Sequence, residues 1–355
     1  MIERRLTNAL MRCWYGRCST LFLPIQVFLL LPLNLFFGLM VRLRRVLYRL
    51  SVFKVERLPV PVVVVGNLNV GGSGKTPLTI ALVEQLRQAG FTPAIVSRGY
   101  GGSARKAMPV MSDSDPAVVG DEPVLLVRRT ECPLWIGRKR VEAARALLAF
   151  HPEVDVLIAD DGLQHLALAR DVELVVVDAA RGFGNGRMLP AGPLREPLSR
   201  LKQVDAVVIN GAQTLAFNLT LPCPCFSMQI AGHDFVNLAQ PDRRVGAEFF
   251  ANQAVHAIAG IGHPQRFFDQ LAALGVEAGV QAFADHHAYV ANDLPAGTVL
   301  MTEKDAVKCA NLGHRLGRAD LWFLAVDAVL DDQLKRLIVN LLQQRKRELD
   351  GSQTT

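Results

Sequence analysis

The chain has 355 residues, which is enough for two domains with a large hydrophobic core. It carries 39 lysines and arginines against 33 acidic residues, and the net charge of +6 suits a nucleotide, a phospholipid surface or a nucleic acid without choosing among them. Its six cysteines form no C-x-x-C pair, which argues against a zinc centre and favours free thiols in a reducing cytoplasm.

A hydrophobic stretch without a charged residue extends from Leu21 to Val41, with arginines on both sides. Its length just reaches the ~20 apolar residues that span a bilayer. Prolines, Asn34 and Gly38 interrupt it, however, and the flanking arginines give no inside–outside asymmetry. A helix that lies in the membrane interface fits at least as well, and a helix buried against the fold is the third alternative. We predict membrane contact over residues 1–55.

Residues 61–77 predict a buried strand of four valines, a glycine-rich turn and the start of a helix. Such a turn lets backbone N–H groups face a polyphosphate at a helix N-terminus; the alternative is a turn without a ligand. Lys75 is expected to contact the β- and γ-phosphates, and Thr76 to coordinate Mg²⁺. Asn69 replaces the usual glycine, and asparagine also tolerates a left-handed backbone. The predicted nucleotide-binding residues are Asn69, Val70, Gly71, Gly72, Ser73, Gly74, Lys75 and Thr76.

Two loops follow that are expected at the carboxyl end of the sheet, where open α/β sheets bind ligands. Arg98 follows a short strand and is a candidate contact for substrate or phosphate. Asp121 precedes an apolar helical segment, and its local pattern favours a helix N-cap; the alternative is a general base for phosphoryl transfer. Arg138 to Arg140 lead into a helix over 141–150 and form either a solvated face or an anion clamp.

A hydrophobic strand over Val154–Gly162 contains Asp160 and Asp161 at its end, as in a Walker B element that holds Mg²⁺. Further strands are predicted over 173–177 and 204–209. The loop between them, residues 181–197, is rich in Gly, Pro and Arg and too long to be a mere connection. Its arginines, Arg195 above all, are predicted to bind a charged substrate.

The last third predicts strands over 255–259, 298–301 and 321–326 and helices over 264–274 and 331–345, after a boundary at 212–221. Thr302-Glu303-Lys304-Asp305 resembles the base-reading loop of GTPases only superficially, because the asparagine is missing. Two adjacent histidines, His286 and His287, point in different directions, which argues against a two-histidine metal site.

Six motifs, in this order, resemble those of the tetraacyldisaccharide 4'-kinases of lipid A (lipopolysaccharide) biosynthesis. With the hydrophobic N-terminal helix they cover essentially the whole chain, and Asn69 belongs to the loop of this family. The motifs are Gly66–Pro77, Ser97–Gly101, Gly120–Pro123, Asp160–His165, Pro190–Glu196 and Phe283–His286.

The resemblance implies transfer of the γ-phosphoryl group of ATP, with Mg²⁺, to the 4'-hydroxyl of a tetraacylated glucosamine disaccharide 1-phosphate. It implies that Asp121 is the general base, with His286 as its hydrogen-bonded partner and His287 as the alternative. The further residues implied are catalytic Lys75 and Arg195, metal-binding Thr76, Asp160 and Asp161, and the substrate contacts Arg98, Glu122 and Arg140, of which Arg140 contacts either ATP or the lipid phosphate.

The resemblance also implies an α/β fold with a P-loop NTPase-like, mostly parallel sheet covered by helices on both faces. We expect a membrane-associated helix in residues 1–55, the kinase core in 56–215, and a smaller α/β domain in 216–355 that closes the active-site cleft. The implied partners are the lipid substrate and membrane lipids, without nucleic acid, at the cytoplasmic face of the inner membrane of a Gram-negative bacterium. The rivals are a membrane-associated P-loop ATPase or GTPase that phosphorylates no lipid, and a non-catalytic scaffold.

Overall fold

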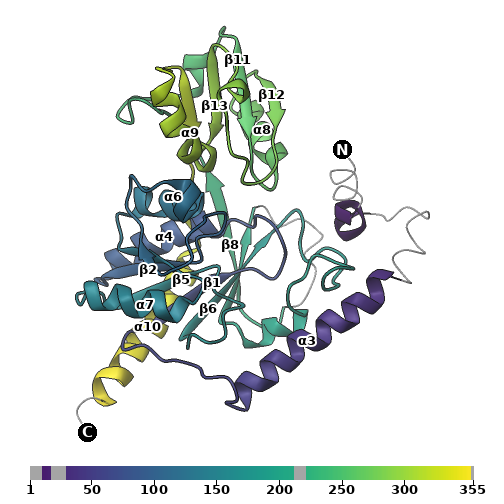
Figure 1. Ribbon diagram of the computed structural model, residues 1–355, viewed down its shortest axis with the longest axis vertical. Coiled ribbons are helices and arrows are strands. Elements are labelled where there is room, and N and C mark those ends of the chain that lie inside the picture. Colours follow the sequence, from purple (N-terminus) through teal and green to yellow (C-terminus); the bar gives the residue numbers. More distant parts are fainter. Residues whose placement is uncertain (1–9, 17–28, 212–220, 353–355) are drawn as a thin grey trace.

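The computed structural model of the protein describes residues 10–16, 29–211 and 221–352. These residues form two β-sheets, each covered by helices, that lie one above the other along the long axis of the molecule (Figure 1). We call the unit with the nine-stranded sheet the large domain and the unit with the six-stranded sheet the small domain. The α/β architecture with mostly parallel strands agrees with the expected fold class.

The sheet of the large domain has the strand order β15-β8-β7-β6-β1-β5-β2-β4-β3. The strand β1 (Val62–Gly66) lies at its centre and pairs in parallel with both β5 and β6, so all five of its residues are buried. The other strands are β2 (Pro93–Ser97), β3 (Met108–Pro109), β4 (Leu134–Ile136), β5 (Val156–Asp160), β6 (Val172–Asp178), β7 (Ala206–Asn210), β8 (Cys225–Ala231) and β15 (Asp327–Leu330).

Alternation along β1 divides the core of the large domain into two layers. Val63 and Val65 pack into one hydrophobic cluster, with apolar residues of α4 (Lys75–Gln88), α6 (Asp121–Thr130) and α10 (Asp332–Ser352). Val62 and Val64 pack into the other, with α7 (Arg140–Phe150) and the 3₁₀ helix η3 (Leu198–Gln203). A further short helix, α5 (Pro116–Val119), leads into α6.

The sheet of the small domain has the order β10-β9-β14-β13-β11-β12. Two helices cover its opposite faces in two separate clusters, α8 (Pro264–Ala273) in one and α9 (Glu303–Arg315) in the other. Its strands are β9 (Phe235–Asn237), β10 (Arg244–Val245), β11 (Val255–Ala259), β12 (Gly279–Ala282), β13 (Thr298–Thr302) and β14 (Leu321–Leu324), and two 3₁₀ helices, η5 (Ala247–Phe250) and η6 (Ala291–Asp293), connect them.

The division at residue 215 differs from the border between the two sheets. β8 pairs with β7, β15 pairs with β8, and α10 packs into the core of the large domain, although all three lie beyond residue 215. The chain therefore leaves the large domain, builds the small domain, and returns. The physical reason is burial, because Leu334, Ile338 and Leu342 of α10 are completely buried against the first sheet. The predicted boundary at 212–221 falls, except for Leu221, outside the described residues.

The N-terminal helix α3 (Leu31–Arg49) lies along the side of the large domain (Figure 1). None of its residues is buried, so the alternative of a helix buried against the fold is wrong for this segment. Asn34 donates a hydrogen bond to the Met188 carbonyl, and Arg45 pairs with Glu196. Within the described part of the chain, no helix combines the length and the apolar character needed to cross a membrane. Residues 17–28, with the start of the Leu21–Val41 stretch, lie outside that part.

Candidate active site

The glycine loop between β1 and α4 turns through two left-handed residues, Gly71 and Gly74, both at φ +98°. Gly74 is the N-cap of α4, and a Cβ at this position would lie 2.3 Å from the amide nitrogen of Asn210. That amide donates to the carbonyl of Ser73 at 3.0 Å. The loop thus requires glycine at position 74, and its backbone leads into the N-terminus of a helix, which favours an anion.

Lys75 lies between an amide and a carboxylate. Its Nζ donates to Oδ1 of Asn67 at 3.3 Å and lies 3.4 Å from Oδ1 of Asp161. The fully buried Asn67 also donates to the carbonyl of Gly71 at 3.1 Å, so one side chain holds both the loop and the lysine. Sequence reasoning assigned no role to Asn67, although it lies within the first motif.

Asn69 supports the glycine loop in a different way from the one expected. Its backbone is not among the left-handed residues of the described chain, so the tolerance of asparagine for that conformation is not used here. Instead, its side chain donates to the carbonyl of Gly182 at 2.8 Å. The Val70 N–H donates to the carbonyl of Pro193, and the Arg195 N–H donates to the carbonyl of Leu68. The long loop 181–197 therefore packs directly on the glycine loop.

The end of β5 brings two carboxylates next to the glycine loop, since Asp160 is in register with Val65 of β1. Asp160 accepts a hydrogen bond from Ser97 Oγ at 3.2 Å, while its Oδ1 is buried with no hydrogen-bond partner among the described residues. Burial, with the nearby charges of Glu122 and Asp161, raises the pKa of Asp160. Burial alone would also raise the pKa of Asp161, but Lys75 and other cations hold it below its ordinary value.

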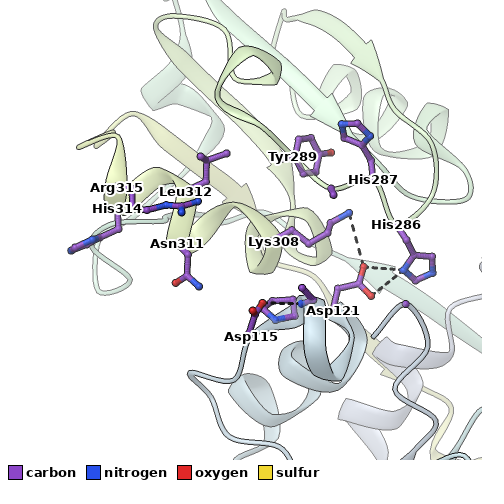
Figure 2. Close-up of a pocket in the computed structure, with 14 residues that line it drawn as sticks. Asp115, Asp121, His286, His287, Tyr289, Lys308, Asn311, Leu312, His314 and Arg315 are labelled. Carbon is purple, nitrogen blue, oxygen red and sulfur yellow. Dashed lines mark hydrogen bonds and ion pairs between the residues drawn. The ribbon is translucent and has the colours of Figure 1, made fainter. Parts of the chain in front are cut away.

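Asp121 and His286 come together from the two domains. His286 Nδ1 lies 3.0 and 3.1 Å from the two carboxylate oxygens of Asp121, which is almost fully buried (Figure 2). His287 contacts Asp293 instead, at 2.9 Å, so of the two histidines it is His286 that faces Asp121. The N-cap of α6 is Gly120, so the prediction that Asp121 is the cap is wrong; its Oδ1 accepts from the N–H of the next residue.

The charges around Asp121 keep it ionised. Burial would raise its pKa, yet His286, Lys304 and Lys308 hold that pKa below the ordinary value. The hydrogen bond to Asp121 is in turn the largest cause that raises the pKa of His286. The ring of Tyr100 lies 5.1 Å from the imidazole, centroid to centroid.

The remaining predicted residues differ in their surroundings. Arg195 lies beside the carboxylate of Asp161, with Nη1 at 3.5 Å, and Glu122 pairs with Lys304 at 3.0 Å. Arg140 is only 3% exposed; it donates to the carbonyls of Gly137 and Asp161 and so braces the loop after β5. Arg98 is exposed near that loop, where its charge lowers the pKa of Arg140.

A cavity of about 670 Å³ opens beside the Asp121–His286 pair, between α5 and α9 (Figure 2). Lys308 approaches Asp121 from α9, to within 4.0 Å, while Asn311, His314 and Arg315 lie farther along the same helix. The buried pair therefore borders a space that connects to the surface.

Sequence reasoning missed several contributions of the small domain. Arg266 of α8 pairs with Asp178 at 3.1 Å and donates to Asn210, beside the glycine loop. Lys304 of α9 lies against the Asp121–His286 pair. The only sequence signal for Lys304 is the Thr-Glu-Lys-Asp segment, and without the GTPase asparagine that segment assigns no role to the lysine.

Comparison with known proteins gives a consistent result over nearly the whole chain. A family profile described as tetraacyldisaccharide-1-P 4'-kinase matches residues 26–343. Proteins named tetraacyldisaccharide 4'-kinase are similar: that of Methylobacillus flagellatus is 47% identical over 342 residues, covering 95% of this chain and 97% of its own length. That of Azoarcus sp. is 50% identical over 321 residues, covering 90% and 92%.

Among solved structures, the chain is similar to the "apo" form of LpxK from Aquifex aeolicus in complex with ATP. The TM-score is 0.75 at 28% sequence identity, with 88% of this chain and 98% of the other covered.

Proposed function

The chain belongs to the tetraacyldisaccharide-1-P 4'-kinase family and is an ATP-dependent kinase of lipid A biosynthesis, and we propose that the site around Lys75, Asp161 and Asp121 performs the transfer. The acceptor is the 4'-hydroxyl of a tetraacylated glucosamine disaccharide 1-phosphate. The observation that carries the assignment of roles is the hydrogen-bonded Asp121–His286 pair, which the two domains build jointly.

The glycine loop binds the phosphates of ATP in this proposal. Backbone N–H groups of the loop face the phosphates, and the N-terminus of α4 adds a favourable field. Lys75 exchanges its contact with Asp161 for the β- and γ-phosphates, which carry more charge than one carboxylate. Arg195, also paired with Asp161, supplies a second cation to the transferred group.

Mg²⁺ is proposed at Thr76, Asp160 and Asp161. These are the hard oxygen donors that Mg²⁺ prefers, and the buried Oδ1 of Asp160 has no hydrogen-bond partner among the described residues. No cluster of three or more His, Cys, Asp or Glu side chains suited to a metal occurs in the described ranges. Mg²⁺ usually takes one or two carboxylates and completes its shell with substrate phosphates and water, and when bound it neutralises charge on those phosphates.

Asp121 acts as the general base in this proposal. One carboxylate oxygen accepts the proton of the attacking 4'-hydroxyl, while His286 Nδ1–H holds the carboxylate in place. Residues around the pair keep Asp121 ionised, so the base is in its active state near neutral pH. The small domain contributes His286, so the base is complete only where the two domains meet.

Transfer of label tests these roles together with the reaction. Purified protein is incubated with ATP labelled in the γ-phosphate, with and without a tetraacyldisaccharide 1-phosphate. We expect label in the lipid and little free phosphate when the lipid is absent. Release of phosphate at the same rate without lipid would instead indicate the rival ATPase or GTPase. Unchanged function of an Asp121→Ala variant would indicate the scaffold.

We propose further that α3 holds the enzyme on the cytoplasmic face of the inner membrane by lying in the lipid interface. Leu35, Phe36 and Leu39 are 73%, 63% and 61% exposed, an unusual amount of apolar surface on one helix. Arg42, Arg44 and Arg49 follow on the same helix, are exposed, and suit acidic headgroups.

Sedimentation with vesicles of acidic phospholipid tests this location. A variant with Leu35, Phe36 and Leu39 changed to serine is expected to bind vesicles at least about tenfold more weakly, because three apolar side chains no longer enter the interface. The matched control changes Met111, Phe150 and Val329 to serine; these residues lie outside α3 and are 61%, 73% and 61% exposed. Equal losses in both variants would refute a specific role for α3.

A further inference from the structure

Lys304 connects the two members of the Asp121–His286 pair. It belongs to α9 of the small domain, yet its Nζ lies 3.9 Å from Asp121 Oδ2 and 3.4 Å from His286 Nε2. The same ammonium lies 3.0 Å from Glu122 and 3.4 Å from Asp285. Its side chain is only 16% exposed, so these contacts are made with little competition from water.

The first turn of α9 is fixed in a way that leaves Lys304 little freedom. Thr302 caps the helix by accepting from the N–H of Asp305, and its hydroxyl donates back to the Asp305 carboxylate at 2.6 Å. Asp305 is completely buried and also accepts from the N–H of Gly260. Glu303, the residue before Lys304, pairs with Arg129 of α6 at 2.7 Å. The Thr-Glu-Lys-Asp segment is thus a rigid junction between α9 and α6.

The geometry at the imidazole gives Lys304 a chemical task. Nδ1 faces the carboxylate of Asp121 and Nε2 faces the ammonium of Lys304. A neutral ring satisfies both contacts in one tautomer only, in which Nδ1–H donates to Asp121 and the Nε2 lone pair accepts from Lys304. A protonated ring would place a second positive charge beside the ammonium. A protonated Asp121 would leave Lys304 with one carboxylate fewer.

We propose that Lys304 is a positioning residue for the phosphoryl transfer, whose ammonium holds His286 in the Nδ1–H tautomer and keeps Asp121 ionised where the two domains meet. The inference rests on the roles proposed above for Asp121 and His286. Burial would lower the pKa of Lys304, but Glu122, Asp121 and Asp285 raise it above its ordinary value, so the charge persists at neutral pH.

Other charged groups also face the pair, and Lys308 is the main one. It lies 4.0 Å from Asp121 but is paired with Asp305 at 2.8 Å, so its charge is compensated in part and its effect on Asp121 is smaller than that of Lys304. The negative charges of Glu122 and Asp285 act on the pair in the direction opposite to Lys304. Because both carboxylates contact Lys304, the ammonium neutralises part of their charge. Among the described residues, no other cation contacts both Asp121 and His286, which separates Lys304 from its neighbours.

The direction of the pH effect does not depend on which member of the pair limits activity. Removing the Lys304 charge raises the pKa of Asp121, because an ion pair is lost, and raises that of His286, because a repelling cation is lost. The active form has both groups deprotonated. The acid limb of kcat/KM against pH therefore moves to higher pH, by about one unit for a cation at this distance.

The experiment compares Lys304→Met with Lys304→Arg and Glu303→Gln in the full-length protein, with labelled ATP and the tetraacyldisaccharide 1-phosphate. We expect the methionine variant to shift the acid limb upward and to lower kcat about tenfold, with a smaller effect on KM for ATP. The arginine variant keeps the positive charge, so its acid limb should lie at the same pH as that of the unaltered protein. Glu303→Gln removes the adjacent interdomain ion pair, and Glu303 is not among the groups that mainly shift the pKa of Asp121, so the acid limb of this variant should stay in place.

A second measurement does not depend on turnover. In protein with ¹⁵N-labelled histidine, the imidazole spectrum reports the tautomer of His286, and Lys304→Met should lose the preference for Nδ1–H. If the methionine variant does not fold, Lys304→Gln removes the same charge and replaces it in both measurements.

The outcomes separate this inference from the proposed function. If Lys304→Met lowers the rate but leaves the acid limb of kcat/KM in place, as expected for Glu303→Gln, Lys304 only docks the domains and the proposal is overturned. A pH profile of Lys304→Met equal to that of the unaltered protein would also overturn it. Full activity of Asp121→Asn would instead overturn the base itself.

Discussion

Replacing Asp121 by asparagine is the most direct test of the proposed base, because it removes the charge and keeps the shape. The Asp121 carboxylate accepts from the N–H of Glu122 at 3.0 Å and from His286 Nδ1 at 3.0 Å. An asparagine carbonyl oxygen can accept from the same donors. The start of α6 and the contact between the domains therefore persist, while the proton acceptor is lost.

The expected loss follows from the worth of a general base. Such a group contributes about 10²–10⁴-fold, which corresponds to about 2.7–5.4 kcal/mol of transition-state stabilisation. ATP binding should change little, because Lys75 contacts Asn67 and Asp161 rather than Asp121. The pKa of His286 should fall, because the hydrogen bond to Asp121 is the largest cause that raises it.

Three measurements check this prediction. Single-turnover transfer of labelled phosphate to the lipid gives the chemical rate, equilibrium binding gives the affinity for ATP, and NMR titration gives the pKa of His286. A rate within about threefold of the unaltered protein would refute the role of Asp121 as the base. A rate loss matched by an equal loss of ATP affinity would show damage to the nucleotide site instead.

Two further changes test the support of the site. Gly74→Ala is expected to cost about 1–3 kcal/mol of stability and to weaken ATP binding, because a left-handed residue gains a Cβ that lies 2.3 Å from Asn210. Thermal unfolding measures this loss. The control, Gly72→Ala, should show no such loss, because a Cβ at that position meets no atom within 4 Å. Arg200→Met is expected to lower the free energy of unfolding in urea by about 3 kcal/mol, because the guanidinium is buried against the carboxylate of Glu173, and to leave the KM for ATP unchanged. A loss below about 1 kcal/mol would contradict this expectation.

Much of the nucleotide half of the site could be predicted from local patterns. The strand of valines, the glycine turn and the helix after Lys75 lie within a short stretch of chain, and each has a strong local preference. The position of Asp160 could be predicted in the same way, because it ends a hydrophobic strand, β5, that pairs with β1. The acceptor half could not be found in this way, and only resemblance to a family pointed to it.

Asp121 illustrates the reason. Its neighbours favour a cap, and nothing within one helical turn distinguishes a capping carboxylate from a base. In the folded chain the cap is Gly120, and the partner of Asp121 is a histidine 165 positions away. Asn69 shows the same limit, because its side chain serves a contact with Gly182 that the local sequence does not contain.

By itself the sequence determined the central strand of the large domain, its glycine loop and the helix that follows, because backbone preference and hydrophobic period act over a few residues at a time. Only the tertiary structure decided that β8 stays in the first sheet and that β15 and α10 return to it, since a short strand can pair with either sheet and the available buried surface makes the choice. It also decided that Lys304 lies beside Asp121 and His286. That juxtaposition depends on how α9 packs on α6, which no segment of the chain specifies alone.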